Sequence, residues 1–268
     1  MYRAYYRLTR PVNRKDIAIE DLFIWDNFQE AISRLDFIKD KGGMVIVSGA
    51  SGVGKTTALR YFVEKLDEKY FKVAYAPLST ISPRDFYRQI SILLCHTASY
   101  NKVQLFHNIQ QTIVELAVKK KQIPIIILDD AHFLKTENFF ELQLLSNFNY
   151  DSLSPVLFIL VSQPHLIDRL KKPVFDAVYQ RIKIHIPIEP LSLDQTRQLL
   201  AHTLCACGRN SADLDQLFDQ QAIETIYSLS KGIQRKIVNI VDKVLMYGAA
   251  NQLQTITTEA VYSISAEL

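Results

Sequence analysis

The sequence contains no hydrophobic run that could cross a membrane as a helix. Such a helix needs about 20 consecutive apolar residues, and no apolar run in these 268 residues approaches that length. The first residues also lack the apolar middle region of a secretion signal. We therefore expect a cytoplasmic protein with no membrane segment.

Cysteine is scarce, with only Cys95, Cys205 and Cys207 in the chain. This odd number, with no second pair, provides neither a disulfide framework nor a zinc site, and it suits reduced thiols in a cytoplasmic compartment. The six histidines are scattered without metal-ligand spacing. These absences argue against zinc and against a secreted, disulfide-linked protein.

Charge of one sign is not in large excess, because the net charge is only +3. That value neither requires nor excludes nucleic acid as a partner. The first sixteen residues are more basic, and their basic and aromatic residues are Arg3, Arg7, Arg10, Arg14, Lys15, Tyr2, Tyr5 and Tyr6. We expect residues 1–30 to form a basic arm and linker, which either contacts phosphates and stacks on bases or adenine, or simply packs on the folded chain.

Between residues 44 and 188, short apolar runs alternate with longer segments of helical period. This alternation predicts an α/β domain, residues 31–190, with three αβα layers and a mostly parallel five-stranded sheet. Continuous apolar runs are typical of strands that are buried on both faces. The expected strands are Met44–Ser48, Lys72–Ala76, Ile123–Leu128, Val156–Val161 and Lys183–Ile188.

The helix boundaries also have sequence signals. Ser82 and Pro83 mark the start of one helix, Ser192 with Gln195 forms a capping box for another, and Gly208 ends that second helix. No strand pattern follows Pro190. Residues 191–268 are therefore expected to form a small helical lid domain, with helices near Thr196–Cys207, Ala222–Leu229 and Arg235–Met246.

The stretch GASGVGKTT follows the first expected strand and fits the pattern G-x-x-x-x-G-K-[ST]. Glycines let such a loop wrap phosphates with backbone N–H groups at a helix N-terminus, a lysine neutralises the β and γ oxygens, and a threonine hydroxyl binds Mg²⁺. The sequence therefore predicts an ATP site with Mg²⁺. Its nucleotide-binding residues are Gly49, Ala50, Ser51, Gly52, Val53, Gly54, Lys55, Thr56 and Thr57.

A phosphate loop of this kind requires an acidic residue on a neighbouring strand to hold the metal. The run IPIIILDD supplies Asp129 and Asp130 at the end of an expected strand. We expect Asp129, with Thr56, to bind Mg²⁺ through water, and Asp130 to polarise the attacking water.

In order along the chain, GASGVGKT, IIILDDAH, LFILVSQPHL, VYQRI and SKGIQRKIVNIVDKVLMYG resemble the motifs of AAA+ ATPases. Within that superfamily the sequence is similar to the ExeA-like group and to the transposition-regulator ATPases of the TnsC, TniB, MuB and IstB kinds. The resemblance runs from about Ala31 to the C-terminus. It implies a P-loop AAA+ domain followed by a helical lid.

The resemblance also implies roles for single residues. Ser162 and Gln163 match the sensor-1 region, with Gln163 preferred, and Arg235 matches the sensor-2 arginine of the lid. Arg181 matches an arginine finger that reaches the γ-phosphate of a neighbouring subunit. Many AAA+ proteins have Asp-Glu where this chain has two aspartates, so we expect slow, assembly-dependent hydrolysis that suits a switch.

Double-stranded DNA would have to contact the ATPase core itself, where an oligomer repeats weak basic contacts many times. In the transposition ATPases, loops in the corresponding regions face DNA. The candidate DNA-binding residues are Arg84, Lys119, Lys120, Lys121, Lys135 and Thr136. A helix end on which lysines complement the dipole is the alternative for residues 119–121.

The leading hypothesis is an ATP-dependent regulator of DNA transposition. It would form a ring or helical filament on DNA and recruit or activate a transposase, with a target-selection protein as a further partner. The first alternative is an ExeA-like cytoplasmic ATPase of a secretion or envelope-assembly system, although secretion-type ExeA proteins continue into a membrane span and this sequence is expected to end at the lid. A small-molecule kinase is a third class of function. Such a kinase needs no arginine from a neighbouring subunit, so the match at Arg181 argues against it.

Overall fold

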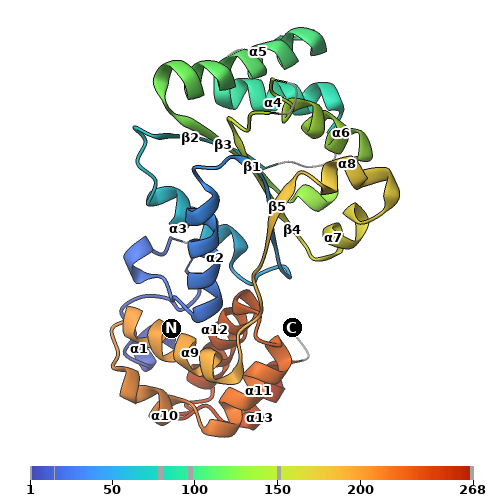
Figure 1. Ribbon diagram of the computed structural model, residues 1–268. Coiled ribbons are helices and arrows are strands. Elements are labelled where there is room, and N and C mark those ends of the chain that lie inside the picture. The colour runs from blue at the N-terminus through green and yellow to red at the C-terminus, as the bar shows by residue number, and fades with distance from the viewer. Residues whose placement is uncertain (1, 15, 78–80, 96–98, 150–151, 266–268) are drawn as a thin grey trace. The chain divides into compact units, whose positions relative to one another are not determined.

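The computed structural model describes residues 2–14, 16–77, 81–95, 99–149 and 152–265 (Figure 1). These residues divide into two compact units. The sheet unit contains residues 28–49 and 55–188, and the helical unit contains the described part of residues 1–27 together with 50–54 and 189–265. None of the described helices has the length and hydropathy needed to traverse a bilayer.

The sheet unit is built on five parallel strands in the order β2-β3-β4-β1-β5. The strands are β1 Gly43–Ser48, β2 Phe71–Pro77, β3 Ile123–Asp129, β4 Leu157–Ser162 and β5 Ile182–Pro187. Each lies within one residue of the strand expected from the sequence. The mostly parallel αβα prediction is therefore confirmed, and the carboxyl ends of all five strands meet at one edge of the sheet.

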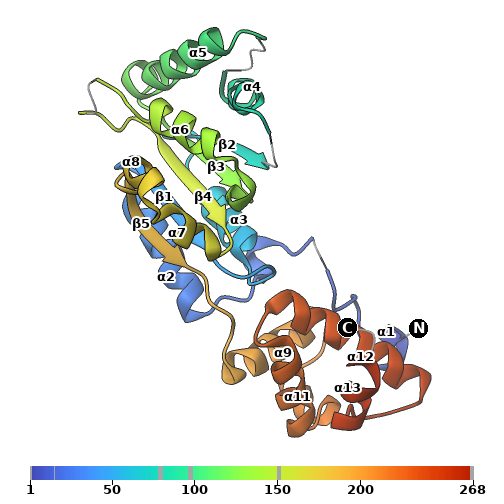
Figure 2. The same cartoon turned by 90° about the vertical axis from the view of Figure 1, so that its right-hand side faces the viewer.

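Helices surround this sheet, as a parallel sheet with buried faces requires. They are α2 Asp26–Ile38, α3 Lys55–Glu64, α4 Pro83–Cys95, α5 Lys102–Val114 with a π-helical extension Glu115–Lys120, α6 Thr136–Leu145, α7 His165–Leu170 and α8 Asp176–Tyr179, with 3₁₀ turns at Ala131–Phe133 and Pro173–Phe175. Figure 2 shows α4, α5 and α6 on one side of the strands. There, Phe158 and Leu160 of β4 join one buried core with residues of these helices, such as Ile90 and Phe139.

The start of α4 has the predicted cap. The Ser82 hydroxyl donates to the Asp85 carboxylate at 2.6 Å and accepts the Asp85 N–H at 3.2 Å. Pro83 is the first helical residue, where its missing N–H costs no hydrogen bond.

The helical unit contains α1 Tyr2–Tyr5, a 3₁₀ turn Ile19–Asp21, α9 Leu193–Ala206, a 3₁₀ turn Ser211–Asp213, α10 Leu214–Leu217, α11 Gln220–Ser230, α12 Gln234–Ala250 and α13 Thr258–Ser265. The capping box is present: Ser192 Oγ accepts the Gln195 N–H at 3.2 Å, and Gln195 Oε1 accepts the Ser192 N–H at 3.0 Å. Gly208, with φ +87°, follows the end of α9. Both helix signals are confirmed.

The described part of residues 1–27 belongs to the helical unit. Tyr2 and Tyr6 are buried; the Tyr2 hydroxyl donates to Asp242 at 2.6 Å, and the Tyr6 hydroxyl donates to the Leu253 carbonyl at 2.8 Å. Burial of these rings therefore favours the packed alternative for Tyr2 and Tyr6. Lys15 lies outside the described residues.

Candidate nucleotide and metal site

The phosphate loop joins the carboxyl end of β1 to the first turn of α3. Its first residue, Gly49, donates its N–H to the Ser162 carbonyl at 3.2 Å, which ties the loop to the end of β4. The Ser48 hydroxyl lies 2.7 Å from Nε2 of His185 on β5. Because α3 begins at Lys55, the unsatisfied N–H groups of its first turn face the loop, and that is a favourable place for an anion.

Lys55 folds back across this loop. Its ammonium donates to the Gly49 carbonyl at 2.9 Å, so the charge lies beside the backbone that the glycines expose. Thr56 is exposed and Thr57 is half-buried in the first turn of α3. Thus the lysine and the hydroxyl that the motif requires are together at one end of the sheet unit.

The middle of the loop, residues 50–54, groups with the helical unit. Gly52 and Gly54 have φ of +87° and +97°, a backbone region that glycine adopts far more easily than other residues. The Arg235 N–H donates to the Gly52 carbonyl at 3.1 Å, and a Cβ on Gly54 would lie 3.2 Å from the ring of Trp25. The first turn of α12 and an N-terminal tryptophan therefore pack on the loop, and the exposed Arg235 side chain starts beside it.

The acidic pair stands at the same edge of the sheet. Asp129 ends β3 and Asp130 follows with φ +53°. Both oxygens of Asp129 are held, because Oδ2 accepts the Tyr75 hydroxyl at 2.6 Å and Oδ1 accepts the Asp130 N–H at 2.9 Å. Burial, reinforced by the hydrogen bond to Asp129, raises the pKa of Tyr75, so this hydroxyl remains a donor. Sequence reasoning missed Tyr75, although β2 and β3 end side by side.

Ser162 and Gln163 follow at the carboxyl end of β4. Ser162 is fully buried, and its hydroxyl has no hydrogen-bond partner within the described part of the chain. Gln163 is half-buried, and its carbonyl accepts the Leu166 N–H at 3.2 Å at the start of α7. The structure therefore brings both sensor-1 candidates to the edge that carries the phosphate loop and Asp129.

His132 lies in the turn after the acidic pair and is buried. Burial lowers its pKa, and the negative charge of Asp130 opposes that shift only in part. Its ring lies edge-on to His165, with 5.2 Å between centroids. The imidazole is therefore mainly neutral at pH 7 and links the turn to α7.

Arg181 lies in the sheet unit but not at the edge that carries Gly49, Asp129 and Ser162. It precedes β5, whose first residue, Ile182, pairs with Met44 near the beginning of β1. Arg181 is half-buried and donates to the Ala177 carbonyl at 3.0 Å. Since the strands are parallel, Arg181 stands at the amino edge of the sheet, opposite the edge of the phosphate loop.

The candidate DNA-binding residues lie at two opposite edges of the sheet. Arg84 and Lys135 are exposed at the starts of α4 and α6, which follow the carboxyl ends of β2 and β3. Asn138 on α6 donates to the Ile81 carbonyl at 3.0 Å and so joins these two helix starts. The exposed Lys119, Lys120 and Lys121 instead precede β3 at the opposite edge. Thr136 is half-buried, and its hydroxyl accepts from Arg169 at 3.3 Å.

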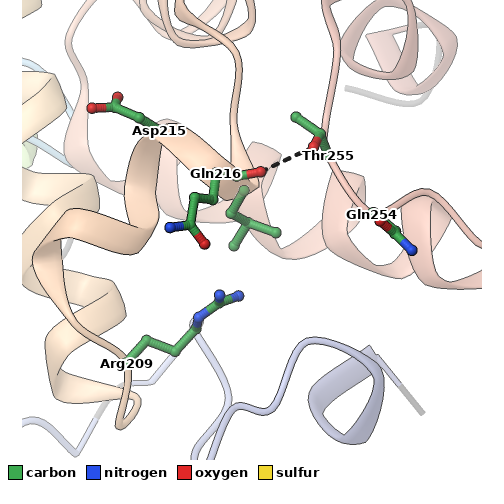
Figure 3. Close-up of a pocket in the computed structure, with 6 residues that line it drawn as sticks. Arg209, Asp215, Gln216, Gln254 and Thr255 are labelled. Atoms are coloured by element: carbon green, nitrogen blue, oxygen red, sulfur yellow. Dashed lines mark hydrogen bonds between the residues drawn. The ribbon is translucent and has the colours of Figure 1, made fainter.

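Hollows are also lined by described residues of the helical unit. The first, of about 460 Å³, is drawn in Figure 3, where the Thr255 hydroxyl donates to the Gln216 carbonyl at 3.0 Å; Arg209, Asp215, Leu217 and Gln254 complete its lining. None of these residues was a sequence candidate. The second, of about 320 Å³, is lined by Ile24, Trp25, Asp26, Ser192, Asp194, Gln195 and Gln198. Trp25 is thus shared by the lining of the second hollow and by the contact with Gly54.

Comparison with known sequences gives a family and a relative. Residues 38–170 match the family described as AAA domain. General secretion pathway protein A from Aeromonas hydrophila is 26% identical over 250 residues, which cover 92% of this chain and 44% of that protein. The chain therefore spans less than half the length of this curated relative.

Solved structures share the fold at low sequence identity. Cdc6p from Pyrobaculum aerophilum gives a TM-score of 0.67 at 15% identity, covering 99% of this chain and 70% of that chain. The Aeropyrum pernix ORC1 protein in complex with DNA gives 0.65 at 15% identity, covering 92% and 66%. RuvB, the Holliday junction branch migration motor from Thermotoga maritima, gives 0.56 at 13% identity, covering 94% and 72%.

Proposed function

We propose that this chain, in which residues 38–170 match the family described as AAA domain, is an ATP-dependent regulator of DNA transposition. In this proposal it binds and hydrolyses Mg·ATP in the cytoplasm and oligomerises on double-stranded DNA as a ring or filament. It then recruits or activates a transposase, with a target-selection protein as a further partner. Hydrolysis resets the assembly.

The proposal that ATP hydrolysis depends on assembly rests on the position of Arg181. It stands at the amino edge of the sheet, whereas Gly49 and Asp129 stand at the carboxyl edge. An arginine finger at that position serves the phosphate loop of a neighbouring copy. Fixed positive charge near the γ-phosphate oxygens is a large part of phosphoryl-transfer catalysis, so a separated chain would hydrolyse ATP slowly.

The remaining roles in this proposal are those expected from the sequence. Loop N–H groups and Lys55 would hold the phosphates, Asp130 would polarise the attacking water, and Gln163 and Arg235 would act as the two sensors of the γ-phosphate. The hollow beside Trp25 is the candidate position of the nucleoside.

Mg²⁺ suits the donor set, because Thr56 and Asp129 offer the hard oxygen ligands that this ion prefers, and Tyr75 already fixes one Asp129 oxygen. When bound, Mg²⁺ neutralises phosphate charge. Asp129 and Thr56 would hold it between the loop and β3.

The proposal of DNA binding is supported by exposed cations on the sheet unit. Arg84 and Lys135 occupy neighbouring helix starts. Each contributes a weak, salt-dependent phosphate contact, and an oligomer multiplies such contacts along the duplex. The shared fold with an ORC1 protein solved in complex with DNA is compatible with this use of the core.

The second candidate function is an ATPase of a secretion or envelope-assembly system. The observation that favours it is the similarity to general secretion pathway protein A across 92% of this chain. Both functions use the same nucleotide chemistry. They differ in whether the protein oligomerises on DNA.

The deciding experiment is co-sedimentation and negative-stain imaging with duplex DNA in four states: ATP, a non-hydrolysable analogue, ADP and no nucleotide. We expect rings or filaments on DNA with the triphosphates only. Asp130→Asn should trap the ATP-bound assembly. Absence of DNA association in every state would refute the transposition proposal and favour the secretion-type ATPase.

The finger is tested separately. Arg181→Ala should abolish hydrolysis while leaving ATP binding by single chains unchanged. Arg197→Ala is the control, because its exposed ion pair with Asp215 lies in the helical unit. Normal hydrolysis by Arg181→Ala would show that another group supplies the positive charge.

A further inference from the structure

A second arginine of the sheet unit, Arg169 on α7, reaches across to the turn that follows the acidic pair. Its Nη1 donates to the Leu134 carbonyl at 2.8 Å and to the His132 carbonyl at 3.4 Å, and its Nη2 donates to the Thr136 hydroxyl at 3.3 Å. One guanidinium therefore binds three acceptors within residues 132–136. The planar fork of arginine suits such multiple bonding better than the ammonium of lysine.

The guanidinium is itself held in place by aromatic rings. Its central carbon lies 5.2 Å from the ring centroid of Phe139 on α6 and 5.5 Å from that of Phe175. These two rings contact each other edge to face at 5.7 Å. A cation over aromatic faces is attracted by the ring quadrupoles. Since the three oxygen acceptors are neutral, we infer that the arginine serves to position the turn rather than to form an ion pair.

The turn begins at Asp130, whose backbone lies in the left-handed region, which aspartate adopts more readily than most residues. Its φ and ψ are +53° and +36°, a left-handed region that disfavours most residues with side chains. The Asp130 carbonyl accepts the Phe133 N–H at 3.0 Å, and the Ala131 carbonyl accepts the Leu134 N–H at 3.1 Å. Ala131 and Leu134 are buried beneath the turn. A change at the carbonyls of 132 and 134 would therefore alter the direction of the Asp130 side chain.

We propose that Arg169 is a positioning residue for ATP hydrolysis, which holds the turn of residues 130–136 so that the Asp130 carboxylate faces the attacking water. The inference rests on the proposed role of Asp130. Arg169 lies on α7, a helix whose first turn is joined to the end of β4 by the hydrogen bond from the Leu166 N–H to the Gln163 carbonyl.

The test compares Arg169→Gln with Arg169→Lys and with the control Arg34→Gln. Arg34 is a suitable control because it lies in the same unit and also donates to a backbone carbonyl, that of His185, at 3.3 Å. For each protein, kcat and KM are measured with saturating DNA, and ATP affinity is measured with a fluorescent ATP analogue. We expect Arg169→Gln to lower kcat by about tenfold or more, since misplaced catalytic groups cost factors of this size, with ATP affinity unchanged. Arg169→Lys should fall between it and the wild type.

Asp130→Asn is assayed in parallel to separate the two possible failures. Normal hydrolysis by Asp130→Asn would refute the role of Asp130. Loss of hydrolysis by Asp130→Asn together with a normal kcat for Arg169→Gln would refute the role of Arg169. If Arg169→Gln does not fold, Arg169→Lys decides, because a wild-type kcat with a single ammonium donor would show that the multiple contacts are unnecessary. Hydrogen exchange at the Leu134 N–H gives a second measurement, and unchanged protection in the Arg169 variants would also contradict the proposal.

Discussion

Replacing Gly52 with alanine is the most direct test of the phosphate loop's conformation. Gly52 has φ +87°, and its carbonyl accepts the Arg235 N–H at 3.1 Å. An added Cβ would lie 2.8 Å from Arg235 Cβ and 3.2 Å from Ile233 Cγ2. Both distances are shorter than the usual 3.5 to 4.0 Å contact between carbon atoms, so the loop backbone must move.

The size of the effect follows from two terms. Alanine in the left-handed region costs about 1 to 2 kcal/mol relative to glycine, and loss of the hydrogen bond from Arg235 costs about 1 kcal/mol. The binding conformation of the loop would therefore become about 2 to 3 kcal/mol less favourable relative to its other conformations. This corresponds to a loss of ATP affinity of about 30-fold to 150-fold.

The assay is a titration of each protein with a fluorescent ATP analogue. Ser51→Ala is the matched control, because Ser51 is expected to bind phosphate through its backbone N–H, which alanine retains, while its side chain is exposed and its φ is not positive. Its affinity should stay near the wild-type value. Wild-type affinity in Gly52→Ala would show that the loop binds phosphate in another conformation and that the contact with Arg235 is dispensable.

Three further predictions concern single side chains. Ser192→Ala removes the capping box of α9 and should lower the free energy of unfolding by about 1 kcal/mol, measured by urea denaturation; an unchanged midpoint would show that the cap contributes nothing. Tyr75→Phe removes the donor to the carboxylate at the end of β3 and should raise the Mg²⁺ concentration for half-maximal hydrolysis by about tenfold, whereas an unchanged Mg²⁺ titration would contradict this role. Burial lowers the pKa of His202 below its ordinary value of 6.5, so its stabilising contribution is complete above pH 6.5 and is lost as pH falls through the lower folded pKa. The free energies of unfolding at pH 7.5 and 5.5, measured by urea denaturation, should therefore differ less in His202→Gln than in the wild type, by at most about 1.4 kcal/mol per pH unit, and an equal difference in both proteins would refute the argument.

Much of the sheet unit could be predicted because its signals are local. Strands β1, β3 and β4 are short apolar runs that are almost entirely buried, so composition alone marks their positions to within a residue, and β2 and β5 are partly exposed apolar-rich runs found with the same accuracy. The phosphate loop and the cap at Ser82 depend on neighbours within a few positions. Such patterns can be recognised in the sequence without knowledge of the tertiary fold.

The missed features depend on partners that are remote in sequence. Tyr75 meets Asp129 only because β2 and β3 pair in register, and Tyr2 meets Asp242 across almost the whole chain. Nothing near Arg169 in the sequence indicates that its acceptors are the carbonyls of another segment. Aligning the ends of the expected strands could have found Tyr75, but no comparable signal existed for Arg169.

The position of Arg181 at the amino edge of the sheet also gives the proposed assembly a direction. If each chain completes its neighbour's site, a closed ring has as many complete sites as chains, whereas an open filament always has one terminal site without a donor. That terminal chain would keep its ATP longest, so one end of the filament would be chemically distinct from the other. A protein that recognises the ATP-bound state could then locate this end, and the filament would mark a polarity on DNA that the duplex backbone alone does not carry.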